Sequence, residues 1–596
     1  MGDIVDVDIR AGRSAAFAGL TRALDAVADA GADFGALPRR YPAEWGVLRP
    51  PRADGASPPP LAAVALSASE RRLHRECERT FRVLAVAAMA LCRASESLDA
   101  TLFLRGAALT DLVSLRGLIR AVEFSRATGL GRLRVEPPTA WEAAEFPEAD
   151  YRAERARCLR LIGLDADPAR LPSLPPRPHP RPGGAAAREE DLLFAAALDT
   201  ALGPVARVSA AMSYCRLAFY VSNWEGMAAA AAACLPAAER LSGHEVAAVA
   251  AEVADRHPAG GENQAIEFEP AILRTAADAR AFLLKALGIQ ATFRGRQDDA
   301  VRRFRAMRET EAPLSPELRA QSHLYTALTL TKRHSDLRGA AAEVDAGLEA
   351  LRPAPREADS IRRERGWLHN LKALTLFSGK DMAGALAHEK RALGCLDGLD
   401  DASSVHLRVN LVSNISVLQE RAGKPEKALE TWERFSRGPG TDDPKFLKHH
   451  AYRAGGLRLR CGDREGAGQE LGTSLRHCAG LADDFHESEV ALELGALLLE
   501  AGRGGQAAER FAQAADATER LGDPYRMALA RTALALAGGG RPGKEVARLA
   551  RASRTHAARA GTLAEAVECA APAGELRALL PAARTKLNRP FDLVNF

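Results

Sequence analysis

The segment LGALLLEAGRGGQAAERFAQAA (residues 494–515) decides the fold of this chain. Its first half carries apolar residues at helical spacing, and glycines then interrupt the pattern. Its second half places Ala507, Phe511 and Ala514 four and three residues apart, on one side of a helix. We therefore expect two helices joined by a tight turn, and the small residues allow these helices to pack closely.

The same plan recurs along the chain, in segments 283–307, 371–393, 414–435 and 454–475. The small residue that follows each turn repeats at intervals of 39 to 45 residues, at Ala300, Ala340, Ala385, Ala428, Ala467 and Ala507. A repeat of this length indicates a solenoid, in which each hairpin buries its flank against the next. The pattern predicts an all-α solenoid.

These hairpins resemble tetratricopeptide repeats. The resemblance rests on Leu494-Gly495, Gly502, Ala507, Phe511 and Ala514, and on a second copy with Leu287-Gly288, Gly295, Ala300 and Phe304. The usual period of that family is about 34 residues, so this chain is similar to a long-period variant. The resemblance implies a right-handed superhelix whose first helices line a concave face, and it extends to bacterial peptide-binding members of the family.

The chain divides into four parts by composition. Residues 1–164 carry no repeat and predict a small N-terminal helical module, and residues 165–185 form a proline-rich linker. The solenoid is expected over 186–560. Residues 561–596 predict a C-terminal cap with a docking tail, because KLNRPFDLVNF is apolar for a chain end. The tail could dock on its own solenoid or on a partner, which leaves a homo-oligomer open.

The composition and the motif content give no support to several classes of function. A net charge of +4 gives no dense basic field, so nucleic acid is not indicated as a partner. The nine cysteines include no C-x-x-C pair, and no H-E-x-x-H motif occurs, so no metal site is predicted. No apolar run of about 18 residues predicts a membrane span, and no leader is evident at the start, so a cytoplasmic location is expected.

The sequence contains no complete catalytic or nucleotide-binding motif. The segment GGGRPGKE (538–545) contains the spacing of a phosphate-binding loop. Glu545 replaces the Ser or Thr that binds magnesium, and an alanine-rich helical pattern precedes the segment where a strand is required. We therefore expect a turn between helices at this place. No catalytic residue and no cofactor site can be named.

Polar and aromatic residues on the first helices are the candidate peptide-binding residues. Asn410 and Asn414 lie on one side of a helix, and asparagine is unfavourable inside helices unless it has a role. Its amide both donates and accepts, so it can pair with the backbone of an extended peptide. The predicted set is Lys285, Tyr325, Trp367, Asn370, Asn410, Ser413, Asn414, His449, Tyr452 and Arg453.

The sequence thus predicts a non-catalytic scaffold or regulator that binds a peptide or protein segment on the concave face of the superhelix. Two alternatives remain open. One is an enzyme, or an essential enzyme subunit, that acts on a peptide bound in the channel. The other is a peptide-responsive transcription regulator, although the N-terminal part shows no convincing helix-turn-helix. Structurally, the candidate residues could instead bridge adjacent hairpins.

Overall fold

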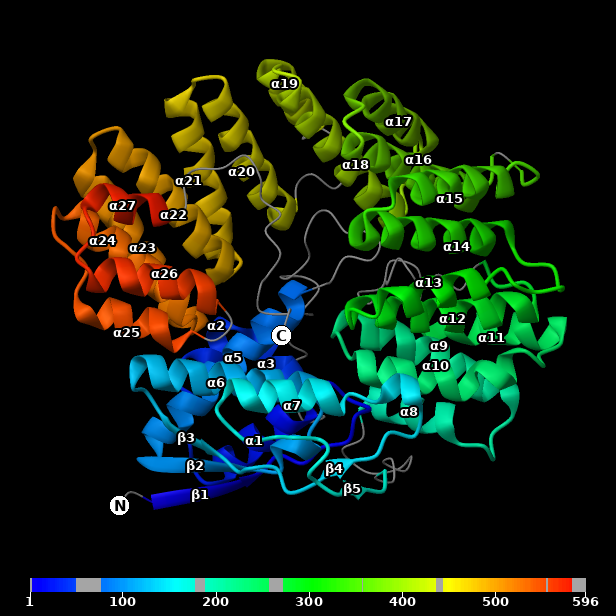
Figure 1. Cartoon of the computed structure of the whole chain (residues 1–596), viewed down its shortest axis with the longest axis horizontal. Helices are drawn as coiled ribbons and strands as arrows, with labels where there is room; N and C mark the ends of the chain where they lie inside the picture. Colours follow the sequence, from blue (N-terminus) through cyan, green and yellow to red (C-terminus); the bar gives the residue numbers. More distant parts are fainter. Residues whose placement is uncertain are drawn as a thin grey trace.

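The computed structural model describes residues 3–49, 77–176, 188–256, 272–355, 357–435, 443–553 and 556–580. Residues 177–185 of the predicted linker and the predicted docking tail after residue 580 lie outside the described residues. Figure 1 shows long helices that follow one another in pairs and curve back to the N-terminal part of the chain. The predicted all-α solenoid is confirmed.

The solenoid consists of antiparallel hairpins. It begins with α8 (Glu189–Leu198), α9 (Pro204–Tyr220), α10 (Trp224–Ala238) and α11 (Gly243–Arg256). In the described residues seven hairpins follow, and their first helices are α12 (Ala276–Phe293), α14 (Pro316–Thr329), α16 (Asp359–Ser378), α18 (Ala402–Arg421), α20 (Pro444–Arg460), α22 (Asp484–Glu500) and α24 (Pro524–Ala537). Their second helices are α13 (Gln297–Ala306), α15 (Leu337–Ala350), α17 (Met382–Cys395), α19 (Pro425–Phe435), α21 (Arg464–Gly480), α23 (Gly504–Leu521) and α25 (Lys544–Ala552). A π-helical turn (Leu330–His334) extends α14.

Two side-chain pairs show why these hairpins close. A Cβ atom built on Gly288 would lie 2.4 Å from the ring of Phe304, and one built on Gly495 would lie 2.5 Å from the ring of Phe511. The glycine in the first helix therefore creates the space that the phenylalanine of the second helix fills.

The second helices often begin with an aspartate cap. Asp336, Asp381 and Asp463 each accept a hydrogen bond from the backbone N–H of the glycine three residues later, at 2.8 to 2.9 Å. A capping side chain satisfies a helical N–H group that has no partner within the helix. Sequence analysis did not use this recurring Asp-x-x-Gly pattern.

The N-terminal module is largely helical, but it also contains a sheet. Strands β1 (Asp3–Asp8), β2 (Ala100–Arg105) and β3 (Arg132–Val135) are parallel, in the order β1-β2-β3. Sequence analysis predicted only helices here, because strands of four to six residues are too short for a clear period-2 pattern. The remaining elements are α1 (Ala18–Asp29), α2 (Leu37–Arg40), α3 (Pro42–Leu48), α5 (Cys77–Ser97), α6 (Leu112–Thr128), α7 (Arg152–Leu161), the short strands β4 (Trp141–Glu142) and β5 (Ser173–Leu174), and the 3-10 turns Ala107–Leu109 and Pro147–Ala149.

The module contacts the start of the solenoid through buried polar groups. The hydroxyl of Tyr214 donates to the carbonyl of Ser14 at 2.5 Å. The guanidinium of Arg155 donates two hydrogen bonds to the carboxylate of Glu225, at 2.9 and 2.7 Å. Such a bidentate pair fixes the relative orientation of the guanidinium and the carboxylate as well as the distance between them. The module is therefore joined to α9 and α10.

The module also contacts the end of the solenoid, so the chain forms a closed ring (Figure 1). Phe124 of α6 packs in one apolar cluster with Met527 of α24 and Val546 of α25. The side chain of Arg120 donates to the backbone carbonyl of Leu521 at 2.9 Å. Helices α26 (Ala557–Glu568) and α27 (Ala573–Leu579) cover this end. Residues 538–543 form the turn that was expected between two helices, and α25 begins at Lys544.

Candidate functional site

The ten predicted residues lie on consecutive first helices. Lys285 is in α12, Tyr325 in α14, Trp367 and Asn370 in α16, and the remaining six in α18 and α20. Their exposure differs sharply. Asn370, Ser413 and Asn414 are half-buried, whereas the other seven are buried, namely Lys285, Tyr325, Trp367, Asn410, His449, Tyr452 and Arg453. Only the three half-buried side chains are open to a ligand without rearrangement.

Two of these three side chains meet between neighbouring hairpins. The amide nitrogen of Asn414 donates to Oδ1 of Asn370 at 3.0 Å and to the carboxylate of Glu389 at 3.1 Å. Among the described residues, the amide nitrogen of Asn370 and Oδ1 of Asn414 have no hydrogen-bond partner. One donor group and one acceptor therefore remain on adjacent first helices, which is the pair that a peptide group requires.

Asn410 lies one helical turn before Asn414 and is only 2% exposed. Within the described part of the chain, its Oδ1 accepts no hydrogen bond. Buried polar atoms almost always have a partner, and one that lacks a partner costs stability. Ser413, beside Asn414, is half-buried. This part of α18 thus carries more polar capacity than the fold uses, and we name Asn370, Asn410, Ser413 and Asn414 the amide patch.

Upstream, the predicted residues serve the fold. The ammonium group of Lys285 is fully buried and donates to Gln321 at 3.0 Å, and Gln321 donates to Glu364 at 2.8 Å. Tyr325 is also fully buried and stacks on Phe304, with 5.2 Å between ring centroids. Lys285 and Tyr325 were expected to face the channel, but they lie between helices instead.

Downstream, the candidate Arg453 already binds a carboxylate within the chain. Its guanidinium lies 2.8 Å from the carboxylate of Glu420 and donates to the hydroxyl of Ser416 at 3.0 Å. Burial lowers the pKa of Arg453. Because this carboxylate is internal, Arg453 connects α20 to α18.

The other aromatic candidates are also covered by neighbouring helices. Burial, together with the nearby ammonium of Lys448, lowers the pKa of His449 well below its ordinary value, so this imidazole is neutral near pH 7. Its ring centroid lies 5.7 Å from that of His486. Tyr452 and Trp367 are both 3% exposed, so neither offers a flat wall to a ligand.

Sequence analysis missed the polar pairs that connect consecutive first helices. Their partners lie 35 to 44 residues apart, close to the repeat period, and the pairs are Lys285–Gln321, Gln321–Glu364, Arg274–Glu317, Asn370–Asn414, Arg453–Ser416 and Lys448–Asp483. Aligning complementary polar residues at that spacing could have found them. Two of these pairs account for the burial of the candidates Lys285 and Arg453.

Within the described ranges, no group of three or more His, Cys, Asp or Glu side chains could hold a metal ion. Among the same residues, no helix combines the length and the apolar content needed to cross a bilayer. Two histidines, His369 of α16 and His388 of α17, do meet, with 3.1 Å between their Nδ1 atoms.

No family model matches the chain, and neither does any curated protein. Similar solved structures include the signal transduction ATPase PH0952 from Pyrococcus horikoshii, which has a tetratricopeptide repeat sensor (10% identity, TM-score 0.42, 97% of this chain and 95% of that chain covered). They also include the apo form of RapI (11% identity, TM-score 0.41, 62% and 96% covered). A third is the Rap conjugation gene regulator of plasmid pLS20 in complex with the Phr* peptide (11% identity, TM-score 0.29, 59% and 98% covered).

Proposed function

We propose that this protein is a non-catalytic regulator or scaffold that binds an extended peptide segment at the amide patch. The observation that carries the proposal is the Asn370–Asn414 pair, which leaves one amide donor group and one carbonyl acceptor unused on neighbouring helices. An extended peptide backbone offers the complementary carbonyl and N–H groups whatever its side chains are. Asn410 on the same helix as Asn414 is buried, so it is not counted among the groups that the peptide contacts.

Binding at this place would use the backbone of the ligand more than its side chains. Each hydrogen bond to a neutral amide contributes about 1 kcal/mol, which corresponds to less than tenfold in affinity. Two or three such bonds give modest affinity, so side-chain contacts must add to them and set specificity. Arg453, His449 and Tyr452 are occupied within the fold and are not part of the proposed contact.

The test is selection of peptides from a random display library on the full-length protein, followed by fluorescence anisotropy with one selected peptide. Asn370→Ala and Asn414→Ala should each weaken binding about three- to tenfold, which is the loss of about one hydrogen bond. Ser378→Ala, an exposed change on the same helix as Asn370, is the matched control and should leave the affinity unchanged.

A second measurement tests recognition of the backbone. N-methylation of the peptide, one residue at a time, should weaken binding at one or two central positions by more than alanine substitution does at the same positions. Unchanged affinity of the Asn370→Ala/Asn414→Ala double variant, with helical circular dichroism intact, would reject the amide patch as the binding site.

A further inference from the structure

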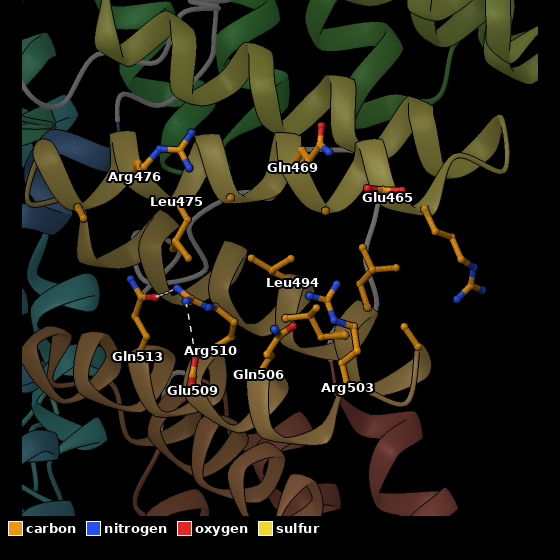
Figure 2. A pocket seen from close by; sticks show the side chains of 17 residues that line it. Glu465, Gln469, Leu475, Arg476, Leu494, Arg503, Gln506, Glu509, Arg510 and Gln513 are labelled. Atoms are coloured by element: carbon orange, nitrogen blue, oxygen red, sulfur yellow. Dashed lines mark hydrogen bonds and ion pairs between the residues drawn. The ribbon is translucent and has the colours of Figure 1, made fainter.

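A groove lies between the second helices of two successive hairpins, away from the amide patch. Helices α21 and α23 form its walls and α22 forms its floor, around a cavity of about 930 Å³ (Figure 2). The lining of α21 runs from Arg464 to Ala479. At 1.5 Å per residue this gives a length of about 20 Å, so the groove is elongated.

The groove exists because one wall has little side-chain volume. Gly468 and Gly472 stand one turn apart on the side of α21 that lines the cavity. A Cβ atom built on either glycine would have its nearest neighbour at 4.0 or 3.9 Å, so there is room for a larger side chain. At Gly495, by comparison, the ring of Phe511 fills the space beside the glycine. Beside Gly468 and Gly472, no side chain among the described residues fills the corresponding space.

The floor of the groove is apolar. Leu494, Leu497 and Leu498 come from α22, and Leu475 extends the apolar surface from α21 (Figure 2). Leu498 is half-buried, and the other three are largely covered by their neighbours. A row of leucines below two parallel walls suits a ligand that presents apolar side chains along one line.

The rim carries excess positive charge. Its basic residues are Arg464, Arg476, Arg503 and Arg510, and its acidic residues are Glu465 and Glu509. Arg464 lies 3.4 Å from Glu500, and Arg510 lies 3.9 Å from Glu509. In the described part of the chain, no carboxylate is within ion-pair distance of Arg476 or Arg503. These two arginines stand on opposite walls, at different ends of the groove (Figure 2).

From the length, the apolar floor and the arginines that flank it, we infer that this groove binds an acidic amphipathic helix of a partner protein. Leucine-type side chains at positions i, i+3, i+4 and i+7 of that helix would lie on the floor, and glutamates on its flanks would meet Arg476 and Arg503. A helix of about 14 residues spans the lining of α21. The site is independent of the amide patch and goes beyond the proposed function.

The probe is a fluorescein-labelled peptide of about 16 residues, with Leu at i, i+3, i+4 and i+7 spacing and Glu at most other positions. Its matched control has Lys in place of each Glu. The Glu peptide should bind the full-length protein at least tenfold more tightly than the Lys peptide in low salt, and added salt should reduce the difference. Equal binding of the two peptides would overturn the proposal.

Two kinds of variant test whether the peptide binds in the groove. Gly472→Leu should fill the groove and weaken binding at least tenfold, whereas Gly561→Leu, on α26 with open space around it, should not. Arg476→Glu and Arg503→Glu should each weaken binding severalfold, and Arg338→Glu, an exposed charge reversal on α15, should have the smallest effect. Full binding by Gly472→Leu would refute the inference.

Two further measurements separate this inference from its alternatives. The Asn370→Ala/Asn414→Ala variant should keep full affinity for the Glu peptide, so failure of the amide patch and failure of the groove can be told apart. If a second copy of the chain occupies the groove, analytical ultracentrifugation will show a dimer that Gly472→Leu dissociates. That outcome would overturn the proposal of an acidic partner helix.

Discussion

The guanidinium of Arg40 in α2 lies 2.8 Å from the carboxylate of Asp484 at the start of α22. The hydroxyl of Tyr41 also donates to this carboxylate, and Arg520 of α23 reaches it at 2.8 Å. Asp484 is 5% exposed, so one buried carboxylate connects the N-terminal module to two helices of the last hairpins. This contact, more than 440 residues apart in sequence, closes the ring.

The first prediction concerns ring closure. Asp484→Ala removes the shared acceptor and leaves the Tyr41 hydroxyl and two guanidinium groups without it. Breaking a buried ion pair costs about 3–5 kcal/mol, and the half-exposed Arg40 and Arg520 reduce this to roughly 2–3 kcal/mol. We expect faster hydrogen exchange at the start of α22 and a larger radius of gyration in solution scattering.

The matched control for ring closure is Asp345→Ala, which removes a half-exposed partner of Lys372 within the solenoid. A surface ion pair of this kind contributes about 1 kcal/mol or less. Its scattering curve should match that of the unchanged protein. If Asp484→Ala leaves both hydrogen exchange and the radius of gyration unchanged, the ring does not depend on this contact.

The second prediction tests the packing that defines each hairpin. Gly495→Ala places a methyl group 2.5 Å from the buried ring of Phe511, so we expect the free energy of unfolding to fall by about 1–3 kcal/mol. Gly561→Ala has no atom nearby and should stabilise its helix by up to about 1 kcal/mol. Thermal unfolding measures both. Phe511→Leu in the Gly495→Ala background should recover part of the lost stability, and equal effects of the two glycine changes would contradict this account.

The hairpins were predictable because their cause is local in sequence. Gly288 and Phe304 lie sixteen residues apart, and their sizes and spacing already describe the packing that the structure shows. The sheet of the N-terminal module was not predictable, because β2 takes its stability from two partner strands that are far away in sequence. The first-helix location of the candidate residues followed from the repeat alignment. The burial of these candidates did not follow from the alignment, because it depends on partners such as Gln321 and Glu420 on the adjacent hairpin.

The third prediction is a pH dependence at the His369–His388 contact. Burial, together with His388, Arg391 and Arg365 nearby, lowers the pKa of His369 to about 4. In the unfolded chain a histidine has a pKa near 6.5, so between these values the unfolded state binds more protons. The free energy of unfolding should therefore fall as the pH decreases from 7 to 5.5, by at most about 1 kcal/mol for this group.

The measurement for His369 is urea unfolding at pH 7 and pH 5.5, compared between the unchanged protein and His369→Gln. The variant cannot bind the proton, so the stability difference between the two pH values should shrink. Lys390→Gln, an exposed change on α17, is the control and should keep the original difference. The same pH dependence in His369→Gln would show that other groups cause it.

The fourth prediction concerns Asp111, which orders the loop before α1. Its buried carboxylate accepts from the backbone N–H groups of Phe17 at 3.1 Å, Gly19 at 3.0 Å and Ser114 at 2.8 Å. Asp111→Ala leaves three buried donors unsatisfied, so we expect the free energy of unfolding to fall by about 3 kcal/mol or more. Asp111→Asn keeps one acceptor oxygen but directs an NH₂ group at the remaining donor, so its cost should be about 1–3 kcal/mol.

Hydrogen exchange of the amides of α1 distinguishes these effects, with Asp336→Ala as the reference for a simple cap. Asp336 is exposed and accepts from Gly339 alone at 2.9 Å, so its loss should cost about 1 kcal/mol and affect only α15. The expected order of destabilisation is Asp111→Ala, then Asp111→Asn, then Asp336→Ala. If Asp111→Ala costs no more than Asp336→Ala, the carboxylate acts as an ordinary helix cap, and the loop before α1 is held by its apolar packing.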